Sequence, residues 1–221
     1  MTQYEPQGFR LLPTAVKHLI IINALCYGIH YVLAYRGVNL IGLASHALGM
    51  PFAPNSFVTL NDILGMWSFD THGFRLWQPF TYMFMHGNLM HLVMNMFMLW
   101  MFGNTMENFW GTRRFIVFYL VCGLGAGLIT IFIPGAHTVG ASAAVYGLLL
   151  AFGMTFPNEY VYLYFFVPIK CKWMIIGMVV LELLEGVFFT YDGIAHFAHL
   201  GGMLIGFLLI LWWRRHPFSR F

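Results

Sequence analysis

Six apolar stretches, each close to the length of a membrane-crossing helix, constrain this chain more than any other feature. A helix needs roughly 17–25 apolar residues to cross about 30 Å of hydrocarbon. Only 9% of the 221 residues are charged, against about 25% in an ordinary soluble domain. We therefore predict an all-α polytopic membrane protein with six transmembrane helices, forming one domain over residues 1–221. The predicted spans are Thr14–Tyr35, His91–Met106, Arg114–Ile133, Ser142–Phe156, Trp173–Thr190 and Ala195–Trp213.

Charge and cysteine content exclude several other classes of protein. Eight acidic and 11 basic side chains are too few to cover a compact soluble globule, whereas a helical bundle in lipid has no such need. The net charge of +3, spread along the chain, forms no basic stripe that would bind nucleic acid. The three cysteines lie in or beside apolar runs and indicate small buried side chains rather than disulfides. The first span is long enough to cross the membrane, so we expect no cleavable signal peptide.

Two predicted spans are short, and a long connection separates the first two spans. The second is expected to begin near residue 87, with its apolar part at His91–Met106, and the fourth covers Ser142–Phe156. A short span ends below the membrane surface, where its free backbone groups need protein or water. The connection Arg36–Phe80 is rich in glycine, proline and aromatic residues. We expect it to be a membrane-associated loop at the interface, with one or two short helices.

The basic residues predict the orientation of the chain. With six spans and a cytoplasmic N-terminus, nine of the 11 basic residues fall on the cytoplasmic side, leaving only Arg36 and Arg75 outside. Positively charged loops stay in the cytoplasm. We therefore expect both termini there. The nine are Arg10, Lys17, Arg113, Arg114, Lys170, Lys172, Arg214, Arg215 and Arg220.

Small residues in the fourth and sixth spans predict that these two helices pack closely. His199 shares a helix face with Gly202 and Gly206, by the repeat of three and four residues along a helix. The fourth span offers Gly147, beside the face that carries Ser142. Small residues at such spacings let two helix backbones approach. We therefore expect Ser142 and His199 to meet.

A contact between Ser142 and His199 would make the serine reactive. A lone membrane serine usually bonds to a carbonyl of its own helix, but a serine beside an imidazole becomes a nucleophile. A histidine inside a membrane is costly without a partner, so we assign His199 as the base for Ser142, with Tyr146 stacked on its ring. We expect Glu182 and Glu185 to lie deeper and to bond neighbouring helices. The sequence thus favours a Ser-His dyad.

The second span carries polar side chains that could stabilise an oxyanion. His91 and Asn95 are four residues apart and share one helix face. His86 precedes the regular helix, with Asn88 as a possible N-cap. Three histidines, His86, His91 and His199, could in principle bind zinc. Since the chain has no H-E-x-x-H motif and no nearby carboxylate to act as a base, we expect no metal and no cofactor.

Three motifs, in order along the chain, resemble those of the rhomboid family of intramembrane serine proteases. They are His86-x4-His91-x3-Asn95, Gly140-x-Ser142 and Ala195-x3-His199-x2-Gly202-x3-Gly206. The resemblance implies Ser142 as nucleophile and His199 as general base. It also implies an oxyanion site formed by His91, Asn95 and the Ser142 backbone N–H, with His86 in support, and it groups Gly140 with the close-packing glycines.

The resemblance also implies the setting and the substrates. It points to cleavage of transmembrane segments of single-pass or other membrane proteins near their outer ends. The expected location is a bacterial inner membrane, with the active site opening to the outer side. Two positions depart from the family pattern. Ala143 follows the serine where glycine is common, and Trp77-Gln78 stands where a Trp-Arg pair often occurs in the first loop.

Two rival functions remain open on the sequence. The first is a non-catalytic rhomboid-like protein that binds other membrane proteins, although such relatives lack the serine or the histidine that this chain retains. The second is a histidine-based transporter or haem-binding bundle. Transporters tend to show internal repeats, and we find none in this chain.

Overall fold

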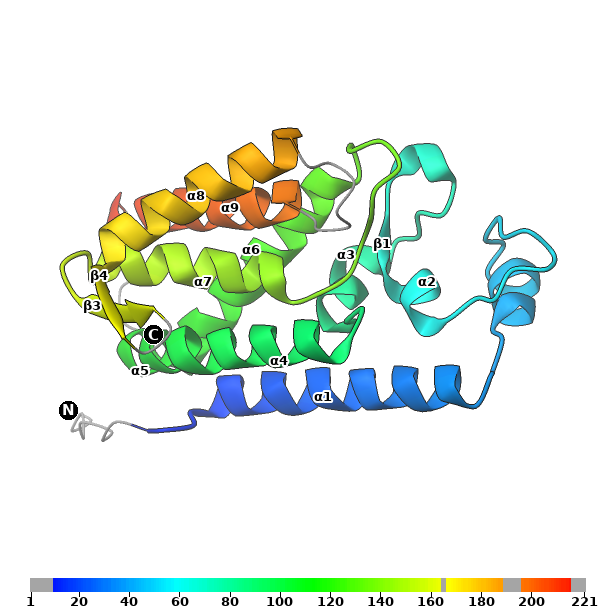
Figure 1. Cartoon of the computed structure of the whole chain (residues 1–221), viewed down its shortest axis with the longest axis horizontal. Helices are drawn as coiled ribbons and strands as arrows, with labels where there is room; N and C mark the ends of the chain where they lie inside the picture. Colours follow the sequence, from blue (N-terminus) through cyan, green and yellow to red (C-terminus); the bar gives the residue numbers. More distant parts are fainter. Residues whose placement is uncertain (1–9, 164–165, 189–195, 216–221) are drawn as a thin grey trace.

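The computed structural model describes residues 10–163, 166–188 and 196–215, which are mostly helical (Figure 1). The order of elements is α1 (Thr14–Tyr35), η1 (Leu43–Ala47), α2 (Leu60–Leu64), β1 (Met66–Trp67), η2 (Phe69–Thr71), α3 (Gln78–Thr81), η3 (Tyr82–Phe84), α4 (Leu89–Met98), η4 (Leu99–Gly103), α5 (Asn104–Trp110), α6 (Thr112–Thr130), β2 (His137–Thr138), α7 (Ser142–Thr155), β3 (Tyr160–Leu163), β4 (Val167–Lys170), α8 (Cys171–Phe188) and α9 (His196–Arg215). Two positions at the predicted end of the fifth span, residues 189–190, and Ala195 of the sixth lie outside the described residues.

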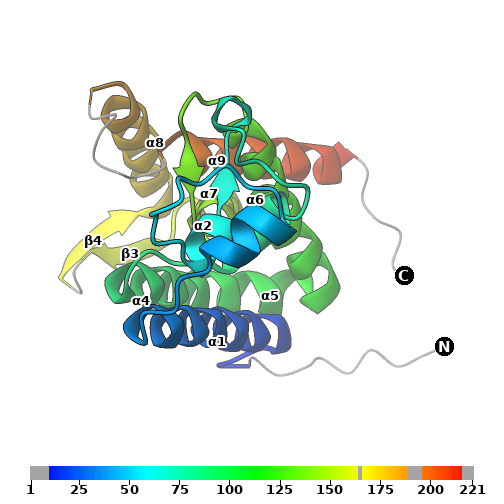
Figure 2. The same ribbon diagram turned by 90° about the vertical axis from the view of Figure 1, so that its right-hand side faces the viewer.

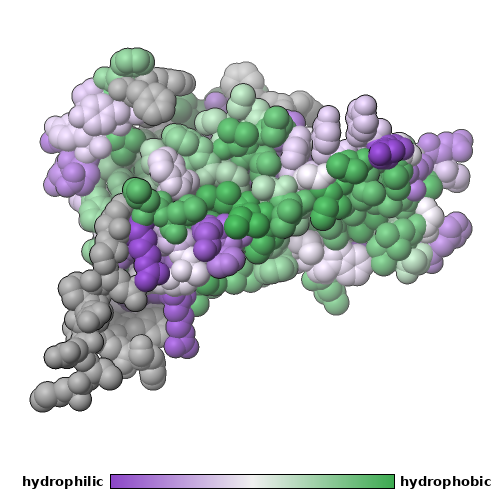
Figure 3. Space-filling view, turned by 90° about the horizontal axis from the view of Figure 1, so that it is seen from below, coloured by the Kyte–Doolittle hydropathy of each residue, from purple (hydrophilic) through white to green (hydrophobic). Residues whose placement is uncertain are grey.

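Among the described residues, three helices are long and apolar enough to cross a membrane, namely α1, α6 and α9, and α7 is a shorter apolar helix. Half of the apolar window of α9 is buried inside the protein, against 6% of that of α1. The last helix is therefore much more deeply packed than the first, which runs along one edge of the molecule (Figures 1 and 2). The exposed face of α1 is a band of apolar side chains, with hydrophilic residues toward the two ends of the molecule (Figure 3). A face of this kind suits lipid better than water.

The second predicted span is a composite of α4, η4 and α5, and it runs further than the sequence predicts. Asn88 caps α4, because its side chain accepts a 2.8 Å hydrogen bond from the His91 backbone N–H. A π-helical turn, η4, then joins α4 to α5 without ending the helix. The end comes at Gly111, whose φ of +82° suits glycine and few other residues. The helix thus continues for one turn beyond Met106, where we predict the end of the span.

Glu107, on α5, holds the start of α1. The first N–H groups of a helix have no partner inside the helix, and here the Glu107 carboxylate accepts from the Ala15 and Val16 N–H groups at 2.9 and 2.8 Å. The Thr112 hydroxyl donates to the same carboxylate at 2.7 Å. Glu107 is buried, so these three donors replace the water that it would otherwise bind.

The connection Arg36–Phe80 is folded and lies at one end of the helical bundle (Figures 1 and 2). It has a small core of its own, formed by Ala44, Met50, Val58 and Ile63. Strand β1 in this connection pairs antiparallel with β2, which lies between α6 and α7. A second antiparallel pair, β3 with β4, joins α7 to α8. The prediction of an entirely helical chain is therefore incomplete, since two-residue and four-residue strands leave too short a pattern to detect.

Gln78 ties this connection together where the family pattern favours an arginine. Its side chain is buried, and its Nε2 donates to the Gly73 and Ile63 carbonyls at 3.1 and 3.3 Å. Its Oε1 accepts from the Arg75 and Trp67 backbone N–H groups at 3.0 and 3.4 Å. A neutral amide, which both donates and accepts, thus links four backbone groups of the loop.

The contact between α7 and α9 brings the two backbones together. A methyl group on Gly202 would lie 1.9 Å from the Ala143 carbonyl oxygen, and one on Gly206 would lie 3.4 Å from the Gly147 Cα. On the opposite helix, a methyl group on Gly147 would lie 3.1 Å from the Gly202 carbonyl oxygen. Three glycines thus remove the side chains that would keep these helices apart.

We expect Gly202→Ala to destabilise the fold by about 3 kcal/mol, because the added methyl group overlaps backbone atoms that cannot move independently. The matched control is Gly177→Ala in α8, where a methyl group would meet nothing within 4 Å. That control should be neutral or stabilising by up to about 1 kcal/mol, through helix propensity. Unfolding in detergent, followed by circular dichroism, measures both. Equal stability of the two variants would contradict this account of the contact.

We expect Glu107→Ala to cost roughly 2–4 kcal/mol, because two buried N–H groups of α1 lose their acceptor. The same unfolding assay measures the loss. Glu159→Ala is the control, since Glu159 is exposed and should change stability by less than about 0.5 kcal/mol. A Glu107→Ala protein as stable as the wild type would show that α1 is held by packing alone.

Candidate active site

Ser142 begins α7, at the end of a tight turn that glycine makes possible. Gly140 has a φ of +128°, and its N–H donates to the Tyr82 carbonyl at 2.8 Å. The serine is half-buried, between buried Ala141 and Ala143. Gly140 is close-packed, as its grouping with the other glycines predicts, but against α4 and not in the α7–α9 contact. A methyl group there would instead lie 2.8 Å from the His91 ring.

His199 lies in the first turn of α9 and reaches the serine across the α7–α9 contact. Its Nε2 is 2.8 Å from the Ser142 Oγ. The Tyr146 ring, one turn along α7, stacks on the imidazole with centroids 4.3 Å apart and an interplanar angle of 6°. His199 itself is buried. Two helices thus hold the imidazole against the serine hydroxyl.

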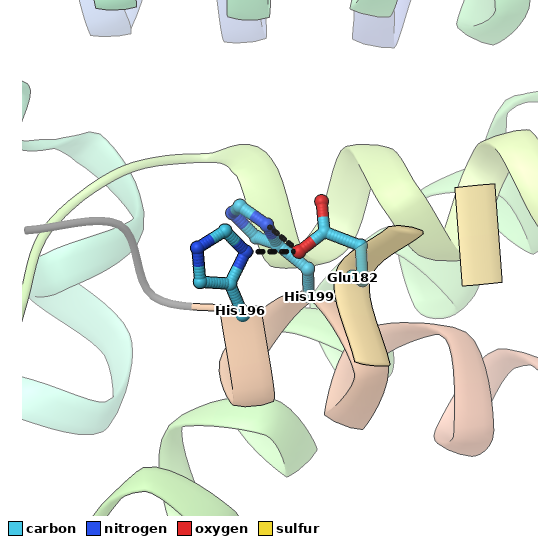
Figure 4. A group of neighbouring side chains, drawn as sticks. All are labelled: Glu182, His196 and His199. Carbon is cyan, nitrogen blue, oxygen red and sulfur yellow. Dashed lines mark hydrogen bonds and ion pairs between the residues drawn. The ribbon is translucent and has the colours of Figure 1, made fainter. Parts of the chain in front are cut away.

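A carboxylate lies on the other side of the His199 ring, and this corrects a sequence-based prediction. Glu182 of α8 was expected to lie deeper, away from the histidine, but its Oε2 is 3.1 Å from the His199 Nδ1. The same oxygen lies 2.8 Å from the His196 Nδ1. Figure 4 shows both rings converging on this oxygen. Glu185 is 3.6 Å from His196, and its side chain is 46% exposed.

The sequence held a signal for this cluster. Two glutamates spaced by three residues, Glu182 and Glu185, precede two histidines with the same spacing, His196 and His199. Residues three apart share a helix face, and a carboxylate in an apolar helix needs a polar partner. The depth at which α8 meets α9, however, depends on the tertiary packing of the bundle and does not follow from spacing.

The polar side chains of α4 border the same space as the serine. A methyl group on Gly140 would lie 2.9 Å from the His91 Nε2 and 3.6 Å from the Ser142 Oγ. The Gly87 N–H points at the His91 Nδ1 over a long distance of 3.5 Å. Asn95, one turn further along α4, is buried and donates from its Nδ2 to the His91 carbonyl at 2.9 Å.

His86 precedes α4 and is fully buried, with its ring centroid 5.0 Å from that of His91. Neither of its ring nitrogens has a hydrogen-bond partner among the described residues. Burial, reinforced by the neighbouring His91, lowers the pKa of His86 to about 4. The ring is therefore neutral at neutral pH and packs edge-on against His91.

A possible metal-binding group differs from the one that the sequence suggested. Within the described ranges, ligand atoms of Glu182, His196 and His199 all lie within 4.8 Å of one another. The trio of His86, His91 and His199 is not among the groups of that kind found in the same ranges. The carboxylate and the two imidazoles are already at hydrogen-bonding distances of 2.8 and 3.1 Å. The donor types could suit zinc, but hydrogen bonding accounts for the observed geometry.

Comparison with known proteins places this site in a family. The model of the Rhomboid domain matches residues 73–216. The chain is 30% identical over 169 residues to RHOMBOID-like protein 6, mitochondrial, of Arabidopsis thaliana, covering 72% of this chain and 51% of the relative. It is 27% identical over 157 residues to the Rhomboid protease GlpG of Photorhabdus laumondii, covering 69% and 53%.

A third relative, RHOMBOID-like protein 4 of Arabidopsis thaliana, is 35% identical over 135 residues, covering 60% of this chain and 33% of the relative. The matched regions span about half the length of the first two relatives. The matched residues of the family model include every site residue described above, from His86 to His199. The chain is thus an integral membrane protein that belongs to the rhomboid family.

Proposed function

We propose that this protein is an intramembrane serine endopeptidase that cleaves transmembrane segments of other membrane proteins. The observation that carries the proposal is the 2.8 Å separation between the Ser142 Oγ and the His199 Nε2. An imidazole at this distance can take the hydroxyl proton and make the oxygen nucleophilic. The name of the Photorhabdus relative, a rhomboid protease, supports the same class of reaction.

The proposed reaction begins when the Ser142 oxygen attacks the carbonyl carbon of the scissile peptide bond. His199 takes the serine proton, and the carbonyl electrons move onto the oxygen to give a tetrahedral oxyanion. As the C–N bond breaks, His199 returns the proton to the leaving amine and an acyl-enzyme remains. Water then enters, gives a proton to His199 and attacks the acyl carbon. As the ester C–O bond breaks, His199 returns that proton to the Ser142 oxygen and the new carboxyl end leaves. No cofactor is needed for these steps.

The oxyanion is assigned to donors around the start of α7. The proposed donors are the backbone N–H of Ser142 and the side chains of His91 and Asn95. A well-aligned donor of this kind stabilises the transition state by about 3–4 kcal/mol. The Gly87 N–H approaches the His91 Nδ1, which favours a proton on the Nε2, the nitrogen that faces Gly140. His86, neutral and packed on the His91 ring, supports this orientation. One N–H of the Asn95 amide donates to the His91 carbonyl, which leaves the second N–H for the substrate.

The proposed architecture has six membrane spans, α1, α4 to α5, α6, α7, α8 and α9, in one domain with the connection Arg36–Phe80 at the interface. The basic residues of α9 agree with one orientation of the protein in the membrane. The basic residues at the last turn of α9, Arg214 and Arg215, lie on the opposite end of that helix from His199. With both termini cytoplasmic, the active site opens toward the outer side.

Two contacts of His199 support a serine protease better than either rival function. A non-catalytic rhomboid-like binder has no use for a serine and a histidine at hydrogen-bonding distance. A histidine-based haem bundle or transporter uses its histidines as ligands, whereas His199 contacts both Ser142 and Glu182, and His86 is fully buried against the His91 ring. The serine protease is therefore the function that the site supports best.

Ser142→Ala is expected to reduce cleavage of a single-pass substrate in proteoliposomes by at least about 10⁴-fold, because the nucleophile is gone. A fluorophosphonate probe, which the serine oxygen attacks at phosphorus with loss of fluoride, should label the wild type and not the variant. Insertion and thermal unfolding of the variant should match the wild type. Undiminished turnover by Ser142→Ala would refute the proposed function.

Removal of metal ions by a chelator is expected to change the wild-type cleavage rate by less than about twofold, because the proposed acyl chemistry needs no metal ion. The measurement is cleavage of the same substrate after dialysis against EDTA, with and without added zinc. A loss of about tenfold or more on chelation, reversed by zinc, would point instead to a functional metal at Glu182, His196 and His199.

A further inference from the structure

We propose that Glu182 is a positioning residue that completes a Ser142–His199–Glu182 triad, with His196 holding the carboxylate in place. This inference rests on the proposed function and extends it beyond a two-residue mechanism. It is carried by one oxygen, the Glu182 Oε2, which lies 3.1 Å from the His199 Nδ1 and 2.8 Å from the His196 Nδ1 (Figure 4).

The first step of the argument concerns the tautomer of His199. A neutral imidazole carries one N–H, on either ring nitrogen. For the Nε2 to accept the Ser142 proton, the N–H must be on the Nδ1. A buried N–H needs an acceptor, and the Glu182 Oε2 stands at 3.1 Å from that nitrogen. Glu182 therefore selects the tautomer that can act as a base.

The second step concerns charge. When His199 takes the serine proton, its ring becomes a cation that is buried in the protein. A carboxylate on the far nitrogen stabilises this cation, as the aspartate does in serine protease triads. The Glu182 side chain is 7% exposed, so its charge is weakly screened and acts strongly over 3.1 Å.

The third step explains how a carboxylate is kept in an apolar helix. His196 lies 2.8 Å from the same oxygen and donates a second N–H to it. Gly186, one turn further along α8, allows the approach, since a methyl group there would lie 3.2 Å from the His196 Cβ. Two imidazoles of α9 thus hold the carboxylate of α8.

The pH dependence of the reaction should depend chiefly on Glu182. In the absence of this carboxylate, the imidazolium form of His199 that arises during the reaction loses its stabilising charge. The Glu185 carboxylate lies 3.6 Å from His196. The described titratable groups facing the His199 ring or its contacts are His91 on α4, Tyr146 on α7, Glu182 and Glu185 on α8, and His196 on α9.

The test compares Glu182→Gln, Glu182→Asp and Glu185→Gln in proteoliposomes, with Ser142→Ala as the inactive reference. A glutamine amide can donate to the Nδ1 and so favours the wrong tautomer. We expect Glu182→Gln to lower kcat about 100-fold or more, with KM within about twofold, and to move the acidic limb of kcat/KM down by about one pH unit. Glu182→Asp should recover at least about tenfold of the loss. Glu185→Gln should keep the wild-type pH profile.

A spectroscopic readout separates this inference from the proposed function. In ¹⁵N-histidine spectra of the wild type in detergent, the His199 signals, assigned by their loss in His199→Gln, should show the proton on the Nδ1. Glu182→Gln should shift the proton to the Nε2. If the wild type failed to cleave any substrate, the proposed protease function would be wrong. The spectra would still show whether Glu182 sets the tautomer of His199. An unchanged tautomer, or an unchanged kcat and pH profile in an active enzyme, would overturn the triad.

Discussion

The contact between α7 and α9 is the constraint on which the rest of this structure depends. Gly202 leaves no room for even one methyl group against the Ala143 carbonyl, and Gly147 and Gly206 continue the same approach one turn further. In lipid, where apolar side chains gain nothing by leaving the solvent, such close backbone packing is the main source of helix association. The reach of His199 to Ser142 follows directly, since each side chain projects from one of these two backbones.

Glu107 and Glu182, the buried carboxylates among the described residues, are both held by groups from other elements. Glu107 receives two backbone N–H groups of α1, and Glu182 receives two imidazoles of α9. Gln78, which carries no charge, hydrogen-bonds backbone groups of the loop in a similar way. A polar group inside a membrane protein is expensive when alone. Each of these residues therefore links segments that lie far apart in the sequence.

Much of this site could be predicted from spacing, and some of it could not. The repeat of small residues on two apolar helices was enough to predict that Ser142 faces His199, and the single turn from Ser142 to Tyr146 predicted the stacked ring. Asn88 could be identified as a cap from its place before an apolar run. Glu182 could not be predicted as the partner of the His199 Nδ1, because the depth at which α8 packs against α9 depends on the whole bundle. The short strands, the π-helical turn of η4 and the network of Gln78 are also products of tertiary contacts.

The location of Glu182 on α8 has a consequence for how the chemistry is coupled to the membrane. The proposed nucleophile and base come from two helices locked by glycine, whereas the proposed third member comes from a helix with apolar side chains exposed along its length, among them Ile176, Val180 and Val187. A sideways displacement of α8 by the length of one hydrogen bond would separate Glu182 from the imidazole and leave Ser142 and His199 together. In the proposed triad, the strength of the base therefore depends on the position of α8, so that whatever packs against its exposed side acts on the reaction through a single oxygen atom.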